Sequence, residues 1–226
     1  MKAGLLIIAT NKYISFIEDL IASADKFFLK DNEVEYFIFT NYESIDVKSN
    51  RKLNLIHVDH REWPWMTLGR YKIFSESCDA FDGFDYLFYC DADMRFCDHV
   101  GPEILSDRVA TQHPGYYGSR GTPETNPKSL ACVHAFEMMQ YFAGGFNGGS
   151  KDEYIKMSKE LSSNIDKDFD NGIIAVWHDE SHMNRYFASN PPTAILDPGY
   201  CYGESLRPPF HPRLIALDKN HEKIRS

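Results

Sequence analysis

The chain contains the stretch Tyr86-Leu87-Phe88-Tyr89-Cys90-Asp91-Ala92-Asp93-Met94-Arg95-Phe96, in which five apolar and aromatic residues precede two aspartates that flank one alanine. An apolar run of this length predicts a buried strand of an α/β sheet. Ligands of such sheets bind just beyond the carboxyl ends of the strands, which is where Asp91 and Asp93 lie. Alternation along an extended chain would turn both carboxylates to one side and Ala92 away from it.

The two carboxylates allow two interpretations. Closely spaced anionic groups repel each other unless a cation lies between them, and oxygen ligands favour Mn²⁺ or Mg²⁺, which would also accept phosphate oxygens. Alternatively, Asp91 caps a turn and Asp93 is solvated, since aspartate is common after strands. The tripeptide alone does not separate the two, so the choice depends on the rest of the chain.

The composition is that of a globular protein: 226 residues, 43% hydrophobic and 14% aromatic, enough for one large α/β domain over residues 1–226. A formal net charge of -9 without a basic stripe argues against a nucleic-acid partner. The five cysteines lack paired short spacings, which favours reduced thiols in a cytosolic setting. No apolar run is long enough to span a membrane or form a signal peptide, so a soluble, cytoplasmic protein is expected.

The order of predicted elements indicates an α/β fold. Apolar runs predict strands at residues 5–9, 34–40 and 53–58, and apolar residues at helical spacing predict a helix over 14–28. Strand, helix and strand joined by short connections are typical of a mostly parallel sheet. Further helices are predicted over residues 67–78 and 152–165 and up to residue 189, and further strands at residues 109–111, 193–196 and 214–217.

Two later segments predict structure near a ligand. Residues 141–149, Tyr-Phe-Ala-Gly-Gly-Phe-Asn-Gly-Gly, contain four glycines, a density that lets a backbone approach a ligand closely. Residues 119–128 are rich in Gly, Pro, Thr and Asn and predict a surface loop near the site. No repeat, low-complexity block or linker divides the chain.

Several motifs together resemble glycosyltransferase family 6, which holds the histo-blood-group A and B transferases, the α-1,3-galactosyltransferase and bacterial relatives. They are Asp85-Tyr86-Leu87, Asp91-Ala92-Asp93-Met94, His113-Pro114-Gly115-Tyr116-Tyr117-Gly118, Gly144-Gly145-Phe146-Asn147-Gly148-Gly149, Trp177-His178-Asp179-Glu180-Ser181-His182-Met183-Asn184 and Lys219-Asn220-His221. Each is weak alone, but the set keeps the family's order across nearly the whole chain. The resemblance implies a GT-A type single domain with a central mixed, mostly parallel sheet flanked by helices. It also favours the metal interpretation, because some bacterial relatives that work without metal carry asparagines at these positions.

The resemblance implies a UDP-sugar donor. Positions that match the family's donor site are Ile8, Ala9, Thr10, Tyr13, Arg70, Asp91, Ala92, Asp93, Ala143, Gly144, Gly145, His178, Asp179, Lys219 and Arg225. Lys219 and Arg225 match residues that close over the diphosphate, where cations form charge-assisted hydrogen bonds. We therefore expect the tail to be loose without donor and ordered with it. Without the resemblance, Tyr13 is equally a core aromatic, Arg70 a solvated helix charge and the tail a frayed end.

Glu180 matches the family's candidate nucleophile. The departing UDP is stabilised by metal, so no carboxylic acid need protonate it, in contrast to glycosidases. One carboxylate can stabilise positive charge at the anomeric carbon, either as a covalent nucleophile or as an electrostatic partner. The resemblance implies retention of the anomeric configuration. Alternatively, Asp179 and Glu180 simply begin a helix, where acids suit the helix dipole, and both roles can hold together.

The resemblance also bears on the two sugars. Ala143-Gly144-Gly145 occupies the stretch that selects the donor sugar, where bulk at the third position tends to exclude an N-acetyl group and glycine leaves room for one. A β-galactoside acceptor, with or without fucose, is the family expectation. The positions that match acceptor contacts are His113, Thr125, Trp177 and Glu180. The loop at residues 125–127 and the segment at 200–204 depart from the family pattern, which affects the acceptor details.

The sequence therefore predicts a metal-dependent, retaining glycosyltransferase with Mn²⁺ or Mg²⁺ as cofactor. It would transfer N-acetylgalactosamine from its UDP donor in α-1,3 linkage to a β-galactoside. A UDP-galactose-dependent α-1,3-galactosyltransferase, a donor hydrolase and a non-catalytic carbohydrate-binding protein are the alternatives. The absence of a membrane anchor is expected of a bacterial or viral member, and the oligomeric state is left open.

Overall fold

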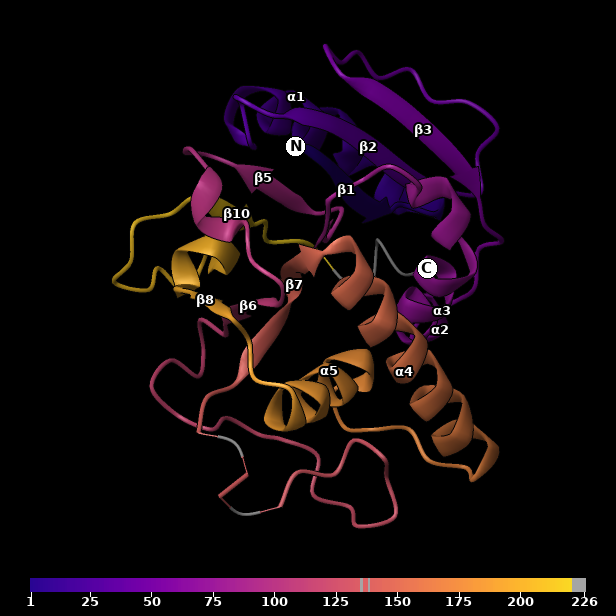
Figure 1. Ribbon diagram of the computed structural model, residues 1–226, viewed down its shortest axis with the longest axis vertical. Helices are drawn as coiled ribbons and strands as arrows, with labels where there is room; N and C mark the ends of the chain where they lie inside the picture. The colour runs from indigo at the N-terminus through magenta and orange to yellow at the C-terminus, as the bar shows by residue number, and fades with distance from the viewer. Residues whose placement is uncertain (135, 138, 221–226) are drawn as a thin grey trace.

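The computed structural model describes residues 1–134, 136–137 and 139–220, and its centre is a seven-stranded sheet in the order β3-β2-β1-β4-β7-β6-β8 (Figure 1). The strands of this sheet are β1 (Lys2–Ile8), β2 (Glu33–Thr40), β3 (Lys52–His57), β4 (Tyr86–Cys90), β6 (Val109–Gln112), β7 (Phe142–Ser150) and β8 (Ala194–Leu196). A three-stranded sheet is formed by β5 (Met94–Phe96), β10 (Leu214–Ala216) and β9 (Tyr202–Gly203). The pairs among β3, β2, β1 and β4 are parallel, as is β6 with β8, whereas β7 runs antiparallel to both of its neighbours.

Helices cover both faces of the large sheet (Figure 1). The α-helices are α1 (Ile17–Phe27), α2 (Trp65–Leu68), α3 (Arg70–Glu76), α4 (Lys151–Asp170) and α5 (His178–Ser189), and the 3₁₀ helices are η1 (Asn11–Phe16), η2 (Cys78–Phe81), η3 (Pro102–Ile104) and η4 (Pro198–Cys201). Successive side chains of β1 point to opposite faces: Leu5 and Ile7 pack with α1, and Leu6 packs with α3, α4 and α5. The expected mixed, mostly parallel sheet flanked by helices is confirmed, and it is consistent with a GT-A type fold.

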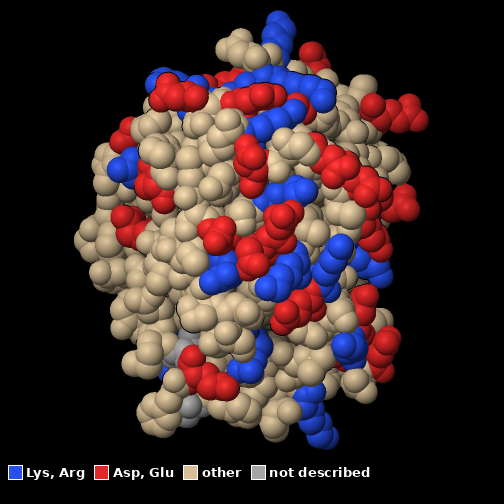
Figure 2. Space-filling view, in the orientation of Figure 1, with Lys and Arg blue, Asp and Glu red and all other residues tan. Residues whose placement is uncertain are grey.

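The surface and the helices show two further properties. On the face in Figure 2, the described Lys and Arg residues are interspersed with Asp and Glu and form no continuous basic area. Within the part of the chain that the structure describes, no helix combines the length and the apolar character needed to cross a membrane.

One predicted helix is divided. The helix expected over residues 67–78 consists of α2, which ends at Leu68, and α3, which begins at Arg70, with Gly69 between them. The N–H of Gly69 bonds to the carbonyl of Trp65, which closes the last turn of α2. Residue 70 thus stands at the start of a new helix, and its side chain enters the interior instead of solvent, with 6% of its surface exposed.

The glycines of β7 serve two different purposes. Gly144 and Gly145 line a cavity at the sheet edge. Gly148 and Gly149 instead permit close packing within the sheet, because a Cβ on Gly148 would overlap the Phe88 ring and one on Gly149 would overlap the carbonyl of Asp107. Only part of the glycine-rich segment therefore faces a ligand site.

We predict that Gly148→Ala destabilises the fold, because its methyl group would displace Phe88 in a closely packed core. The free energy of unfolding should fall by about 1–3 kcal/mol or more in urea denaturation. Gly115→Ala is the control, since Gly115 is exposed and its Cβ would meet only the His113 ring at 3.3 Å. Equal stability of the two variants would contradict the packing role of Gly148.

Candidate active site

A cavity of about 550 Å³ opens where β1 and β4 end, beside the middle of β7 and the N-terminus of α5. This is the edge of a parallel sheet at which ligands of α/β proteins bind. It gathers most of the predicted site from distant parts of the chain. The predicted residues that line it are Ile8, Thr10, Tyr13, Arg70, Asp91, Ala92, Asp93, Gly144, Gly145, Trp177, His178, Asp179, Glu180 and Lys219.

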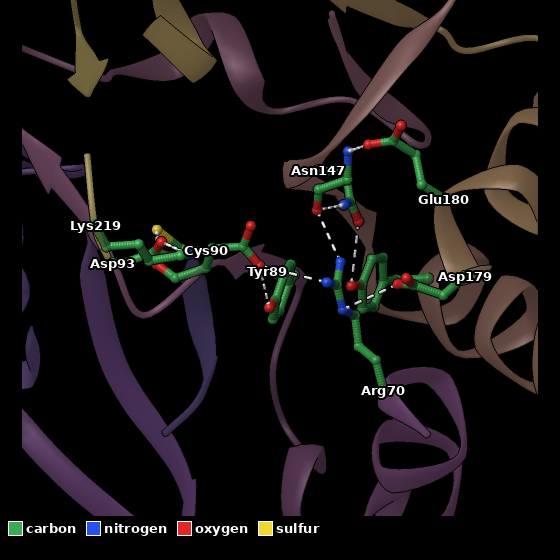
Figure 3. Close-up of polar contacts among 11 residues, drawn as sticks. Arg70, Tyr89, Cys90, Asp93, Asn147, Asp179, Glu180 and Lys219 are labelled. Atoms are coloured by element: carbon green, nitrogen blue, oxygen red, sulfur yellow. Dashed lines mark hydrogen bonds and ion pairs between the residues drawn. The ribbon is translucent and has the colours of Figure 1, made fainter. Parts of the chain in front are cut away.

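The two aspartates lie in a turn rather than in extended strand. β4 ends at Cys90, and residues 91–93 lead through this turn into β5. Both aspartates line the cavity, but so does Ala92, so the strict alternation expected from a strand does not apply. Asp91 Oδ1 accepts a hydrogen bond of 2.5 Å from the Tyr89 hydroxyl, and Asp93 forms an ion pair with Lys219 (Figure 3).

Arg70 joins three separate parts of the site (Figure 3). Its Nε lies 3.2 Å from Asp179 Oδ2, its Nη2 lies 3.3 Å from Asp91 Oδ1, and its Nη1 donates to the Gly144 carbonyl at 2.8 Å. The guanidinium also lies over the Tyr89 ring, 4.0 Å from its centroid, an arrangement typical of a cation–π contact. The alternative interpretation of Arg70 as a solvated helix charge is therefore wrong.

Two acidic residues of the first turn of α5, the buried Asp179 and the half-buried Glu180, have raised pKa values. Burial raises the pKa of Asp179 to about 6, although the positive charge of Arg70 opposes the increase. Burial likewise raises the pKa of Glu180 to about 7, although its carboxylate accepts a 2.7 Å hydrogen bond from the N–H of Gly144. A carboxyl group inside a cavity whose pKa is raised to near 7 is typical of a functional site.

The carboxylate oxygens at the end of β4 suit a hard divalent cation whose remaining coordination positions are filled by a bound ligand and water. Among the described residues, no three or more His, Cys, Asp or Glu side chains are arranged so that they alone could hold a metal ion. Two carboxylates, Asp91 and Asp93, face one cavity, and Mg²⁺-like ions are commonly held by one or two carboxylates together with phosphate oxygens and water. Lys219 supplies the positive charge at Asp93 in this structure.

Several lining residues were not identified from sequence: His60, Arg61, Trp63, Met66, Thr67 and Tyr89. His60 Nδ1 lies 2.9 Å from Thr10 Oγ1, and the Trp63 ring centroid lies 4.9 Å from that of His178. The segment around Trp63-Pro64-Trp65 has no strong sequence signal for a ligand. Tyr89, however, precedes Asp91 by two positions, and the alternation of β4 could have indicated that it faces the same side.

Other predicted residues do not line the cavity. Ala9 and Ala143 are buried next to lining residues, and Arg225 lies outside the described residues. Of the acceptor positions, His113 packs against the ring of Tyr141 at 5.8 Å, and burial lowers its pKa to about 4. Thr125 lies in the loop beside Glu124, whose carboxylate also accepts from the N–H of Val176. Neither position lines the cavity, but Glu124 connects Thr125 to Val176, the neighbour of the lining residue Trp177.

The fold and this cavity at the sheet edge are those of an α/β ligand-binding protein, and comparison with known proteins identifies its family. The chain belongs to glycosyltransferase family 6, whose family model matches residues 1–226. It is 37% identical over 238 residues to Histo-blood group ABO system transferase 1 of Rattus norvegicus, covering 99% of this chain and 68% of the relative. It is 33% identical over 239 residues to Globoside alpha-1,3-N-acetylgalactosaminyltransferase 1 of Homo sapiens, covering 100% and 69%. It is 25% identical over 227 residues to O-antigen biosynthesis glycosyltransferase WbnI of Escherichia coli, covering 98% and 97%.

Membership in this family identifies the chain as a hexosyltransferase that uses a UDP-sugar donor and a glycan acceptor. The cavity agrees with this activity, because anionic and cationic side chains meet at the sheet edge. The exact donor sugar and the acceptor are considered below.

We predict that Arg70→Met destabilises the protein in a pH-dependent manner. At about pH 8 the variant leaves the Asp179 carboxylate buried without its cation, which costs about 3–5 kcal/mol of unfolding free energy. At about pH 5 the loss is smaller, because Asp179, whose pKa burial raises to about 6, is then largely neutral with or without Arg70.

Urea denaturation at the two pH values measures this difference. The control is the double variant Arg70→Met with Asp179→Asn, which removes the buried charge and should recover part of the stability at the higher pH. An equal loss for Arg70→Met at both pH values would contradict the pairing of Arg70 with Asp179.

Proposed function

We propose that this chain transfers N-acetylgalactosamine from UDP-N-acetylgalactosamine, in α-1,3 linkage and with retention of configuration, to a β-galactoside with or without fucose. The proposal depends on one observation: the backbones of two adjacent glycines, Gly144 and Gly145, bond to Glu180 and to Asp91 respectively. The N–H of Gly144 bonds to Glu180, and the carbonyl of Gly145 accepts from the N–H of Asp91. The candidate catalytic carboxylate and the candidate metal ligands thus border one cavity.

Asp91 and Asp93 are proposed to hold Mn²⁺ or Mg²⁺, and Lys219 and Arg225 to contact the donor diphosphate. A bound divalent ion would neutralise charge on the departing UDP. Lys219 already reaches this position from the tail, where it pairs with Asp93. In the presence of donor, its ammonium group would bond to phosphate oxygens, which form strong charge-assisted hydrogen bonds.

The remaining donor residues are assigned by their places around the cavity. Ile8, Thr10 and Tyr13 lie where β1 ends and would receive the nucleoside, with Ala9 supporting them from the interior. His178 and Asp179 at the start of α5 would contact the diphosphate and the sugar hydroxyls. Arg70 would hold Asp91 and Asp179 in place while it balances their charge.

Glu180 is proposed to act at the anomeric carbon. Its side chain is half-buried at the cavity wall, and the Gly144 N–H fixes one of its carboxylate oxygens. A carboxylate held in one orientation can stabilise the positive charge that develops as the bond to UDP breaks, or form a covalent bond to the sugar. Either role requires the ionised form of Glu180.

The donor sugar is proposed from the space around Gly145. A Cβ at this position would lie 3.2 Å from Asp91 Oδ2 and 3.2 Å from Cys201 Sγ, so bulk there would crowd the metal ligand as well as the sugar. Glycine adds no side chain to the cavity wall here, and together with the family pattern at this position this supports N-acetylgalactosamine over galactose. A packing preference of this kind is worth about 1–3 kcal/mol, so UDP-galactose remains the alternative donor.

The acceptor is proposed to bind at the mouth of the cavity. Trp177 is 44% exposed there, and its indole N–H donates to Thr122 Oγ1 at 2.8 Å, which fixes the ring as an apolar surface for a sugar. His113 and Thr125 would lie on the same side. A non-catalytic carbohydrate-binding role is disfavoured, because binding alone does not require Asp91, Asp93, Glu180 and Lys219 together.

We predict a metal-dependent transfer activity with a donor preference. With Mn²⁺ and a panel of β-galactosides, kcat/KM for UDP-N-acetylgalactosamine should exceed that for UDP-galactose by about 10-fold or more, and chelation of the metal should abolish transfer. Product linkage is assigned by NMR spectroscopy. A preference for UDP-galactose would refute the argument from Gly145, and full activity with a chelator present would refute the metal role of the aspartates.

We predict that Glu180→Gln lowers kcat by about 10³-fold or more while the affinity for UDP changes little, because the amide keeps an acceptor for the Gly144 N–H but carries no charge. In the parent enzyme kcat should fall below about pH 7, because protonation of Glu180, whose pKa burial raises to about 7, removes the active carboxylate. Turnover is measured across pH and UDP affinity by titration calorimetry. Parent-like turnover of the variant would eliminate Glu180 as the catalytic carboxylate.

A further inference from the structure

β7 contains a bulge at the wall of the cavity. On its β6 side, Ala110 pairs with Asn147 but the next residue, Thr111, pairs with Ala143, so residues 144–146 are extra on β7. Backbone groups that leave the ladder inside a protein require other partners. Here the N–H of Gly144 donates to Glu180 and its carbonyl accepts from Arg70. The bulge therefore presents its backbone to the catalytic groups.

Asn147 supplies a second donor to the same carbonyl. Its side chain is fully buried, and its Nδ2 donates to the Gly144 carbonyl at 3.0 Å (Figure 3). The hydroxyl of Tyr154, which extends from α4, donates to Asn147 Oδ1 at 3.3 Å. The Gly144 carbonyl fixes the orientation of this amide, since a flipped amide would place its oxygen, an acceptor, against the carbonyl oxygen, another acceptor.

We propose that Asn147, which also bonds to Tyr154, is a positioning residue that fixes the Gly144 backbone and through it the carboxylate of Glu180. Glycine rotates about φ and ψ more freely than any other residue. Gly144 connects one peptide unit whose N–H holds Glu180 to a second whose carbonyl is held by Asn147 and Arg70. Holding the carbonyl limits rotation about Gly144 and thereby aims the N–H. The catalytic relevance of this contact rests on the proposed role of Glu180.

The pKa of Glu180 should respond to the strength of its hydrogen bond with the Gly144 N–H. A hydrogen bond to a carboxylate lowers its pKa, so a looser Gly144 N–H should raise the pKa of Glu180 further. A substitution at residue 147 leaves in place the other titratable or charged groups that face Glu180, which are Tyr141, Asp179, Arg70, Tyr71 and Cys201.

Three variants test the proposal. Asn147→Leu removes the donor to Gly144 at similar volume but leaves the Tyr154 hydroxyl buried without a partner. The double variant Asn147→Leu with Tyr154→Phe removes both polar partners, which limits the loss of stability. Thr111→Val is the matched control, because Thr111 Oγ1 donates at 2.8 Å to the carbonyl of Phe146 in the same bulge without involving Gly144.

Two measurements are made on each variant: the pKa of Glu180 in the unliganded protein, by NMR titration of ¹³C-labelled glutamate, and kcat for transfer. Both Asn147 variants should raise the pKa of Glu180 by at least about half a pH unit. They should lower kcat by about 10- to 100-fold, as displacement of a catalytic group does. Thr111→Val should change neither, and UDP affinity should stay within about twofold throughout.

An unchanged pKa of Glu180 in both Asn147 variants would overturn the inference, as would an equal rise in Thr111→Val. A raised pKa together with reduced kcat would support it. A raised pKa with parent-like kcat would confirm that Asn147 positions Glu180 and would instead contradict the proposed catalytic role of Glu180, so the two failures are distinguishable.

Discussion

The buried guanidinium of Arg70 is the constraint on which the site depends. Asp91 and Asp179 lie on different elements, and burial of Asp179 disfavours its charged form. Arg70 contacts both carboxylates and also the Gly144 carbonyl, so one cation fixes the end of β4, the bulge of β7 and the start of α5 relative to one another. Burial of a cation is costly unless its N–H donors are paired. Here two carboxylates and one carbonyl pair with the guanidinium and offset that cost.

The bulge of β7 makes a central strand part of the cavity wall. An ordinary strand would direct its N–H and C=O groups to its neighbours, whereas residues 144–146 leave the β6 ladder, and Gly144 and Phe146 bond to side chains instead. Gly144 gives its N–H to Glu180, and Gly145 gives its carbonyl to the backbone N–H of Asp91. The glycines suit this place because they have no side chain to fill the space next to Asp91. The same few peptide groups therefore belong to the central sheet and contact the side chains of the candidate site.

Local sequence patterns predicted the strands of the sheet and the position of Asp91 and Asp93, because an apolar run followed by charged residues can be recognised from a few consecutive residues. They could not place Arg70, whose partner Gly144 is 74 positions away, and whose environment exists only after folding. Likewise, nothing local separates Gly145, which faces the cavity, from Gly148, which packs against Phe88. The family resemblance located Glu180, but its raised pKa follows from burial, which requires the folded chain. Arg225 and the ordering of the tail stay predictions.

The proposed function requires that the turn after β4 bind a divalent ion together with the donor diphosphate. Anomalous diffraction from crystals grown with Mn²⁺ and UDP measures this most directly. We predict a manganese peak bonded to the carboxylates of Asp91 and Asp93 and to diphosphate oxygens, with Lys219 moved from Asp93 to the phosphates. Bound UDP without manganese at this turn, while Lys219 stays on Asp93, would contradict it.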